Sequence, residues 1–403
     1  MGRLFGTDGV RGIANRELTP ELAFKLGKAG TFVLKKESKR PIIIIGKDTR
    51  VSGDMLENAL TAGILAVGGI VISASHNSFE YNGIKFFNGD GYKLDDLLEE
   101  KIEDLILSSV DVNSHITGDL IGKCLEAEEN ARALYEQHLL ETVDYRLDGK
   151  KIVLDCANGA AYLAAPRVYR ELGAEVIVLS DEPNGVNINE NCGSTHPERM
   201  AAKVRETGAD LGLAFDGDAD RLIVCDDLGR IVDGDKTIAI CARMLKREGR
   251  LAENKVTATV MSNIGFHKAM EAAGINVDVT GVGDRYVLER MLETGCVLGG
   301  EQSGHIIFRE FATTGDGTLS SLQFVKAVLE DGRAVSEIAD EIRIYPQVLV
   351  NAKINNDYKK TYSKDAEVAA AIQALESKMQ GNGRVLIRPS GTEPLVRVML
   401  EGS

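Results

Sequence analysis

Short apolar runs alternate with amphipathic stretches and polar turns along most of the 403-residue chain. A continuous apolar run of a few residues is typical of a strand that is covered on both faces in a parallel sheet. The runs end in loops rich in Gly, Asn or Asp that lead into the next helix, as in βαβ units. We predict strands of this kind at residues 42–45, 70–72, 151–155, 175–179, 211–215, 255–261, 275–279 and 296–298.

The helices between these strands have their own signals. Thr19 and Pro20 suit the N-cap and the first position of a helix, and Leu22 and Leu26 fall on one face of it. A second helix is expected around residues 55–67.

The alternating pattern divides the chain into units. It occurs in three stretches, 1–127, 128–229 and 230–344, whereas residues 345–403 combine apolar runs with one charged helical stretch. The fold class that we predict is α/β. It consists of three similar α/β units with mixed, mostly parallel sheets, plus a smaller C-terminal α+β domain, around a central cleft. Loops at the carboxyl ends of such strands are where α/β proteins bind ligands.

Composition narrows the class of protein. The formal charge of −14 argues against nucleic acid or an anionic membrane as a bulk partner. The six cysteines are scattered without a CxxC pair, which fits reduced thiols, and the N-terminus has no apolar signal region. The longest aliphatic run is too short to span a bilayer. We therefore predict a cytoplasmic protein.

Ser75 is the first candidate for chemistry, because it follows an apolar run and has His76, Asn77 and Lys85 close by in sequence. Taken alone, a serine in such a loop more often caps a turn. It is not part of a G-x-S-x-G elbow, so the hydrolase interpretation lacks its motif.

Three carboxylates follow another apolar run, at Asp216, Asp218 and Asp220. If the segment is extended, alternate side chains point to one side and form a set of hard oxygen ligands suited to Mg²⁺. We expect the backbone at Ala219 to be one that tolerates a Cβ atom. A calcium loop fits poorly, since an EF-hand needs Gly where Arg221 stands. A solvated acidic turn is the remaining alternative.

Two later loops are rich in hydrogen-bonding groups. Alternation in the segment 300–305 would place Glu301 and Ser303 on one side, where they could bind sugar hydroxyls, and His305 could transfer a proton. Taken alone, that segment is better explained as a glycine-rich turn with a structural histidine. The segment 388–397 is a clearer anion-binding loop, with two arginines, two hydroxyls and a glycine between two prolines.

Two weaker candidates are Lys47 with Arg50, and the run 283–285. Each of these is also explained as solvated loop charge.

Taken together, these motifs resemble the α-D-phosphohexomutase family. The resemblance is carried, in family order, by residues 5–12, 73–77, 82–87, 216–221, 300–305 and 388–397. The opening FGTDGVRG and Gln302 resemble the glucosamine branch of the family rather than its glucose or mannose branches.

The resemblance implies a role for each motif. Ser75 would carry the phosphoryl group, and Asp216, Asp218 and Asp220 would bind Mg²⁺ together with that phosphate. Lys85 and His305 would be candidate acid and base residues. Arg11, Lys85 and Arg221 would surround the transferring phosphate. Glu301 and Ser303 would bind the sugar. The second phosphate, which does not react, would be held by Arg388, Ser390, Gly391, Thr392 and Arg397.

The implied reaction converts glucosamine 6-phosphate to glucosamine 1-phosphate through a 1,6-bisphosphate. Mg²⁺ would be the cofactor, and either phosphorylation of Ser75 or a hexosamine 1,6-bisphosphate would activate the protein. The only partner implied is a small phosphosugar, and a homodimer is left open. Alternatives are the same chemistry on glucose or mannose phosphates, a phosphatase, and a non-catalytic phosphosugar-binding protein.

The chain departs from the family pattern at three places. Ser78 stands where the family has proline. Between Val67 and Gly69 the family has a further strand and helix, so we expect the first sheet to lack a strand. We also expect the C-terminal domain to be incomplete, because the sequence ends just after a strand.

Overall fold

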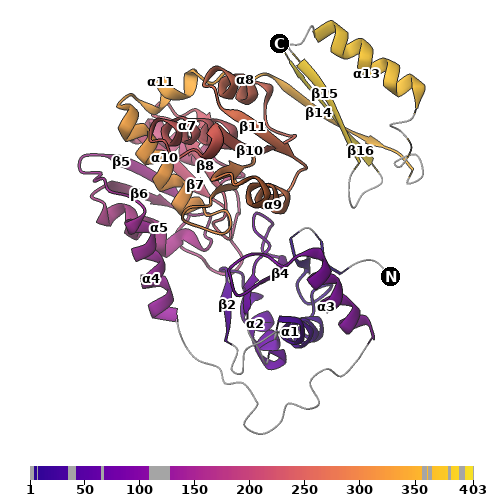
Figure 1. Cartoon of the computed structure of the whole chain (residues 1–403). Coiled ribbons are helices and arrows are strands. Elements are labelled where there is room, and N and C mark those ends of the chain that lie inside the picture. Colours follow the sequence, from indigo (N-terminus) through magenta and orange to yellow (C-terminus); the bar gives the residue numbers. More distant parts are fainter. Residues whose placement is uncertain are drawn as a thin grey trace.

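The computed structural model describes residues 4–6, 8–34, 42–64, 68–108, 128–355, 361, 365–379, 383–389 and 395–402. These residues form four sheets, three of which contain parallel strand pairs, while the last is entirely antiparallel. Figure 1 shows the second and third sheet units packed side by side, with the N-terminal unit and the C-terminal unit on separate flanks. The predicted fold class is confirmed.

The N-terminal unit has a four-stranded sheet in the order β1-β4-β3-β2, in which β2 and β3 are parallel. Its apolar cluster is separate from that of the next units and includes Leu26, Leu56 and Ile72. The elements are β1 (Val10–Ile13), α1 (Pro20–Leu34), β2 (Ile43–Lys47), α2 (Gly53–Gly63), β3 (Gly68–Ile72), β4 (Tyr81–Phe87) and α3 (Asp96–Ser108).

Strand β2 contradicts one sequence-based expectation. Residues 42–45 were expected to be covered on both faces, but β2 is the edge strand, and Ile42 and Ile44 are 68% and 71% exposed. Side chains alternate between the two faces of a strand, and Ile43 and Ile45 pack against the apolar cluster of this unit, whereas Ile44 lies on the other face, which is left uncovered at this edge of the sheet. Among the residues that the structure describes, no further strand lies between α2 and β3, as expected from the short stretch before Gly69. The helix expected to reach residue 67 ends at Gly63.

The second unit has a five-stranded sheet in the order β6-β5-β7-β8-β9, with β6, β5 and β7 parallel and the last two antiparallel. Every residue of β7 and β8 is buried. The elements are α4 (Glu128–Glu141), β5 (Lys151–Asp155), α5 (Ala161–Glu171), β6 (Glu175–Leu179), α6 (Glu198–Thr207), β7 (Leu211–Phe215), β8 (Leu222–Cys225) and β9 (Ile231–Val232).

The third unit repeats this plan, with sheet order β11-β10-β12-β13. One apolar cluster runs through both units, joining residues such as Phe215 and Val224 to Phe266 and Phe324. The elements are α7 (Gly234–Arg247), β10 (Lys255–Thr259), α8 (Ile264–Ala272), β11 (Asn276–Thr280), α9 (Asp284–Thr294), β12 (Leu298–Gly300), β13 (Ile306–Phe308), α10 (Gly317–Asp331) and α11 (Val335–Asp340).

The C-terminal unit is an antiparallel sheet in the order β14-β16-β15, with α13 (Ala366–Met379). Its strands are β14 (Gln347–Lys353), β15 (Gly383–Pro389) and β16 (Leu395–Gly402). Glu401 joins it to the third unit, because its Oε1 accepts a hydrogen bond from the Ile264 amide at 2.8 Å. No helix among the described ranges is long and apolar enough to cross a membrane.

Candidate active site

Ser75 lies in the loop between β3 and β4 and is only 2% exposed. Its φ angle is 51°, a left-handed conformation that is uncommon for serine. Its amide donates to Ser73 Oγ at 3.0 Å, and its own Oγ donates to Asp216 Oδ2 at 2.6 Å. The loop therefore brings the hydroxyl of the N-terminal unit directly to the acidic motif of the second unit.

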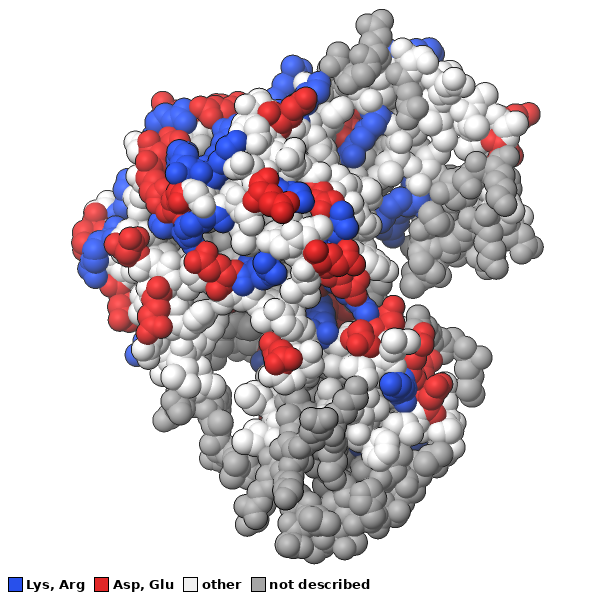
Figure 2. All heavy atoms as spheres, viewed as in Figure 1, with Lys and Arg blue, Asp and Glu red and all other residues white. Residues whose placement is uncertain are grey.

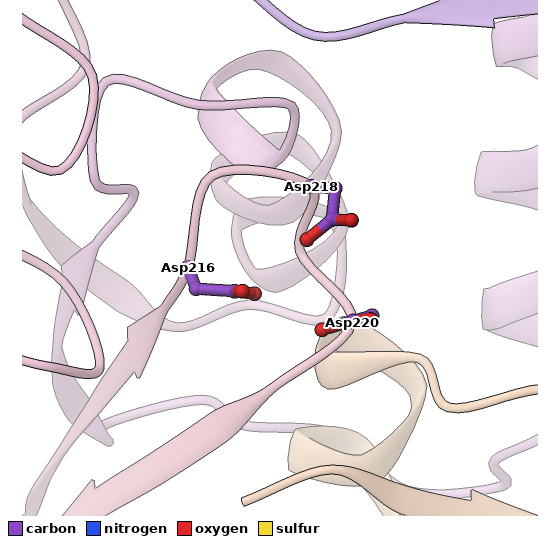
Figure 3. Close-up of side chains that lie close together, drawn as sticks. All are labelled: Asp216, Asp218 and Asp220. Atoms are coloured by element: carbon purple, nitrogen blue, oxygen red, sulfur yellow. The ribbon is translucent and has the colours of Figure 1, made fainter. Parts of the chain in front are cut away.

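The acidic motif follows β7, whose buried strand delivers Asp216 to the carboxyl edge of the second sheet. One oxygen or more from each of Asp216, Asp218 and Asp220 lies within 4.8 Å of the others. Figure 3 shows the three side chains pointing toward one another from this loop. The cluster predicted from the sequence is present.

The reason that we gave for the cluster is wrong, because residues 216–220 form a turn rather than an extended segment. The turn brings the carboxylates together through Ala219, whose φ is 61°. The Ala219 backbone was expected to suit a Cβ atom, but this conformation costs a non-glycine residue on the order of 1 kcal/mol. The surrounding contacts must hold it. One of them is the Gly317 amide, which donates to the Ala219 carbonyl at 2.8 Å.

The three carboxylates differ in their electrostatics. Burial and the neighbouring Asp220 and Asp218 carboxylates raise the pKa of Asp216 well above its usual range. Burial opposes ionisation of Asp218 as well, but the charges of Lys85 and Arg11 outweigh it and lower its pKa. For Asp220, burial and the Asp218 charge are outweighed chiefly by His305, and its pKa is lowered.

The cluster fits a divalent cation. Asp218 Oδ1 and Asp220 Oδ1 are buried and, in the part of the chain that is described, have no hydrogen-bond partner. Burying a carboxylate oxygen without a partner lowers the free energy of unfolding unless a cation binds to that oxygen. Hard oxygen ligands favour Mg²⁺ or a similar ion.

Three cations from the N-terminal unit surround Asp8, a residue to which the sequence motif assigned no role. Lys85 Nζ lies 3.0 Å from Asp8 Oδ2 and 2.9 Å from Asp218 Oδ2. Lys93 Nζ lies 2.6 Å from Asp8 Oδ1, and Arg11 also pairs with Asp8. Lys85 is almost fully buried, and the attraction of Asp218 and Asp220 outweighs burial to raise its pKa.

His305 closes the other side of the acidic cluster. Its Nδ1 lies 3.4 Å from Asp220 Oδ2, and its Nε2 lies 4.0 Å from Asp284 Oδ2. Burial disfavours the charged ring, but these two carboxylates outweigh it and raise its pKa. Lys93 pairs with Asp284 too, so the N-terminal and third units meet at this point.

The remaining side chains of the site also take defined positions. The Arg221 amide donates to Asp216 Oδ1 at 3.1 Å. Burial, with Arg221 and Arg11 nearby, lowers the pKa of His76 to about 4. His76 is therefore neutral near pH 7, with Nδ1 3.4 Å from Ser75 Oγ.

The loop at 300–305 is a turn, so the alternation expected of Glu301 and Ser303 does not apply. Glu301 Oε1 accepts a hydrogen bond from the Gly283 amide at 3.0 Å, while Ser303 is exposed. His305 pairs with Arg221 in an antiparallel bridge that fastens this loop to the acidic motif.

Arg388 and Arg397 are partners across β15 and β16 in the C-terminal unit. Burial and the Arg397 charge lower the pKa of Arg388, and Glu301 of the third unit acts in the opposite direction. Figure 2 shows a hollow between the C-terminal and N-terminal units, with charged side chains of both signs at its inner end. The predicted phosphate-loop residues Ser390, Gly391 and Thr392 lie outside the described residues.

The sequence interpretation assigned no role to Lys93, Asp8 or Asn189, and it gave Arg50 and Asp284 only as weaker candidates that solvated loop charge would also explain. Lys93, Asp8 and Asp284 form a chain of ion pairs between units, and Arg50 and Asn189 contact the Ser75 loop. Asp8 could have been proposed from the sequence, because it lies in the motif at residues 5–12. Asn189 offered no signal beyond an asparagine-rich loop.

A buried hydroxyl lies beside three carboxylates that could bind a metal ion, with cations around them, all at strand ends of α/β units, and this class of site is suited to phosphoryl transfer. Comparison with known proteins narrows this class. Four sequence profiles match, all described as phosphoglucomutase/phosphomannomutase: α/β/α domain I at residues 2–69 and 65–111, domain II at 133–229, domain III at 233–345 and the C-terminal domain at 349–403. The chain belongs to the phosphoglucomutase/phosphomannomutase family.

Full-length relatives are named phosphoglucosamine mutase. Those of Alkaliphilus metalliredigens and Clostridium novyi are each 53% identical to the chain, covering 100% of it and 95% of the relative. Both alignments span 427 positions, more than the 403 residues present here, and the domain I profile matches in two pieces that meet at residues 65–69. The segment expected to be absent near Gly69 is thus absent relative to the family.

Solved structures share the fold at low identity. A phosphoglucomutase/phosphomannomutase family protein from Burkholderia thailandensis superposes with a TM-score of 0.80 at 22% identity, covering 99% of this chain and 93% of that chain. Aspergillus fumigatus N-acetylphosphoglucosamine mutase, in complex with GlcNAc-6P and magnesium, gives 0.71 at 17% identity, covering 99% and 92%.

Proposed function

We propose that the chain is a phosphoglucosamine mutase that interconverts glucosamine 6-phosphate and glucosamine 1-phosphate. The observation that carries this proposal is the 2.6 Å hydrogen bond from Ser75 Oγ to Asp216, inside the three-carboxylate cluster. The choice of glucosamine rests on the names of the full-length relatives.

In this mechanism Ser75 carries the phosphoryl group. The first transfer breaks the bond between Oγ and phosphorus, forms a bond from phosphorus to a sugar hydroxyl oxygen, and leaves the hydroxyl proton on Oγ. The second transfer breaks the other sugar oxygen–phosphorus bond of the 1,6-bisphosphate, forms a new bond from phosphorus to Ser75 Oγ, and returns the proton to the released sugar oxygen. Lys85 and His305 are the candidates for moving the proton, because each is buried against a carboxylate of the site.

Asp216, Asp218 and Asp220, with an oxygen of the phosphoserine, would hold Mg²⁺. The ion would stabilise negative charge on the transferring phosphate. Arg11 and Arg221 add positive charge around the same position. One guanidinium group can donate two parallel hydrogen bonds to two oxygens of a phosphate. Asp218 and Asp220 are ready to accept a cation, since both have lowered pKa values.

The mutase must hold a second phosphate that does not react. We assign this task to Arg388 and Arg397, together with Ser390, Gly391 and Thr392, and we assign the sugar to Glu301 and Ser303. The Glu301 carboxylate acts on the pKa of Arg388, so the residue assigned to the sugar lies close enough to a residue assigned to the second phosphate for their charges to interact, which supports this division. The tasks would then divide among domains 1–127 (phosphoserine), 128–229 (metal), 230–344 (sugar) and 345–403 (second phosphate).

We expect the protein to work in the cytoplasm on a small phosphosugar. The five cysteines among the described residues are free and buried, and Cys124 lies outside those residues. Free thiols suit a reducing compartment.

The test is turnover by the purified protein with Mg²⁺ and a catalytic amount of hexose 1,6-bisphosphate. Glucosamine, glucose and mannose 6-phosphates are compared by kcat/KM, and Ser75→Ala is the control. We expect the highest kcat/KM for glucosamine 6-phosphate, and a phosphate-sized mass increment on Ser75 that Ser75→Ala lacks. A preference for glucose or mannose phosphate would assign the sister activity. Steady release of inorganic phosphate would instead indicate a phosphatase, and binding without turnover a non-catalytic protein.

A further inference from the structure

Two peptide carbonyls of the serine loop each accept hydrogen bonds from the same two side chains. Arg50 Nη2 donates to the carbonyl oxygen of Ser75 at 3.1 Å and to that of Asn77 at 2.7 Å. Asn189 Nδ2 donates to the same two oxygens at 2.9 Å and 3.0 Å. Arg50 belongs to the N-terminal unit and Asn189 to the second unit, in the loop between β6 and α6.

The Arg50 side of this arrangement is rigid. Its guanidinium is fully buried and pairs with Asp48, whose Oδ2 also accepts from Ser73 Oγ at 2.5 Å. Ser73 in turn accepts from the Ser75 amide. One buried network therefore fixes the backbone on both sides of the Ser75 side chain.

The Asn189 side connects the loop to the acidic motif. A Cβ atom added to Gly217 would lie 2.5 Å from the Ser75 carbonyl oxygen and 2.8 Å from Asn189 Nδ2. Gly217 stands between two of the three carboxylates, so the Ser75 carbonyl is enclosed by the motif that would hold the metal. Asn189 itself has φ 58°, which asparagine tolerates better than most residues.

We propose that Asn189 is a positioning residue, which with Arg50 clamps the Ser75 and Asn77 carbonyls and so holds the nucleophile of one unit against the carboxylates of another. The kinetic part of this inference rests on the proposed mutase function. Ser75 has to stay in a left-handed conformation through both transfers, and two donors from two units hold it there. Asn189 does not touch the reacting atoms, so its effect passes through the loop.

The test compares Asn189→Asp with Asn191→Asp. Asn191 has nearly the same backbone (φ 52°), lies two positions away and is exposed, which makes it a matched control. Asn189→Asp keeps the size and the backbone preference but replaces two donors by an oxygen that repels both carbonyls. We expect kcat to fall on the order of 10²-fold in both directions of the reaction, with KM for the sugar phosphate unchanged. Asn191→Asp should stay within about twofold of the parent on both parameters.

Hydrogen–deuterium exchange of the peptide covering residues 74–81 provides a readout that does not depend on activity. The Ser75 and Asn77 amides are hydrogen-bonded within the loop, to Ser73 Oγ and the Ala74 carbonyl. We expect their exchange to be about tenfold faster in Asn189→Asp and unchanged in Asn191→Asp. An inactive parent protein would overturn the proposed function while this comparison still tests the clamp.

Equal exchange in the two variants would overturn the clamp, and so would a kcat for Asn189→Asp within twofold of the control. The loss of kcat in Asn189→Asp could match a smaller fraction of folded protein, while residues 74–81 of the folded molecules still exchange slowly. That result would mean that Asn189 contributes only to stability. If Asn189→Asp does not fold, Asn189→Gly takes its place, because glycine accepts the left-handed backbone and lacks the donors.

Discussion

Lys85 Nζ lies 2.9 Å from Asp218 Oδ2, although the two residues come from different sheet units and are separated by 133 positions in the sequence. Both side chains are largely buried, at 5% and 10% exposure. The pair thus joins the strand that follows the serine loop to the motif that would bind the metal. Without Lys85, the Asp218 carboxylate would keep little compensation other than that of Arg11.

Lys85→Met should therefore destabilise the metal-free protein by about 3–5 kcal/mol, since it leaves a buried carboxylate without its cation. Lys151→Met is the matched control. Lys151 pairs with Glu175 at 3.3 Å, but both are partly exposed, so its loss should cost about 0–1 kcal/mol. Chemical denaturation of both variants measures the difference. Equal stabilities would show that the Lys85 pair is not a net contributor.

The same variant tests the catalytic role if it is compared with Lys85→Arg. Arginine keeps the positive charge but cannot release a proton near neutral pH. If Lys85 moves the proton, both variants should lose about 10²–10⁴-fold in kcat, while Lys85→Arg retains more stability than Lys85→Met. Activity near the parent level in Lys85→Arg would restrict Lys85 to an electrostatic role and leave His305 as the proton carrier.

The acidic cluster makes a prediction about metal dependence. Chelation should abolish turnover, and free Mg²⁺ should restore it. Asp220→Asn removes one charged ligand, and we expect the Mg²⁺ concentration for half-maximal activity to rise at least about tenfold. Because the pKa of Asp216 is raised, Mg²⁺ must displace a proton there, and apparent Mg²⁺ affinity should increase with pH. A half-maximal concentration that is the same for the parent and Asp220→Asn would argue against this ligand.

Gly315 offers a steric test of His305. A Cβ atom at Gly315 would lie 2.4 Å from Cε1 of the His305 ring, whereas one at Gly89 would meet nothing within 4 Å. Gly315→Ala should displace the ring from Asp220 and lower kcat on the order of 10²-fold, and Gly89→Ala should not. Steady-state kinetics of both variants decide this, and equal kcat values would mean that the ring position is not critical.

The sequence allowed the strands and the main site to be predicted because both depend on local patterns. Apolar runs located β5, β6 and β7 at their observed bounds, and three aspartates directly after one of these runs indicated the cluster around Asp216, although a turn rather than the expected alternation brings them together. Exposure of Ile44 could not be predicted, since it depends on the position of β2 in the sheet. The contacts of Asn189 and Lys93 depend on how separate units pack, for which a single sequence has no signal.

The junction between the third and C-terminal units contains a buried carboxyl group, Asp235, whose Oδ2 accepts from the Asn263 amide at 2.6 Å. Asn263 is the residue that holds the start of the C-terminal unit, because its Oδ1 accepts from the Tyr345 amide and its Nδ2 donates to the Tyr345 carbonyl. Burial, with the Asp233 carboxylate close by, raises the pKa of Asp235 to about 7.

This shift makes stability depend on pH with a definite sign. Between about pH 4 and pH 7 the unfolded chain has released the Asp235 proton while the folded protein retains it, so the free energy of unfolding decreases as pH rises. The slope from this group is at most about 1.4 kcal/mol per pH unit, and it vanishes above the folded pKa.

Asp235→Asn cannot titrate, so its stability relative to the parent should increase from pH 4.5 to pH 7.5 and then level off. Thermal unfolding across that range measures the effect, with the exposed Asp181→Asn as the control. Parallel pH profiles for the parent and Asp235→Asn would show that Asp235 is ionised in the folded protein and that the junction tolerates its charge.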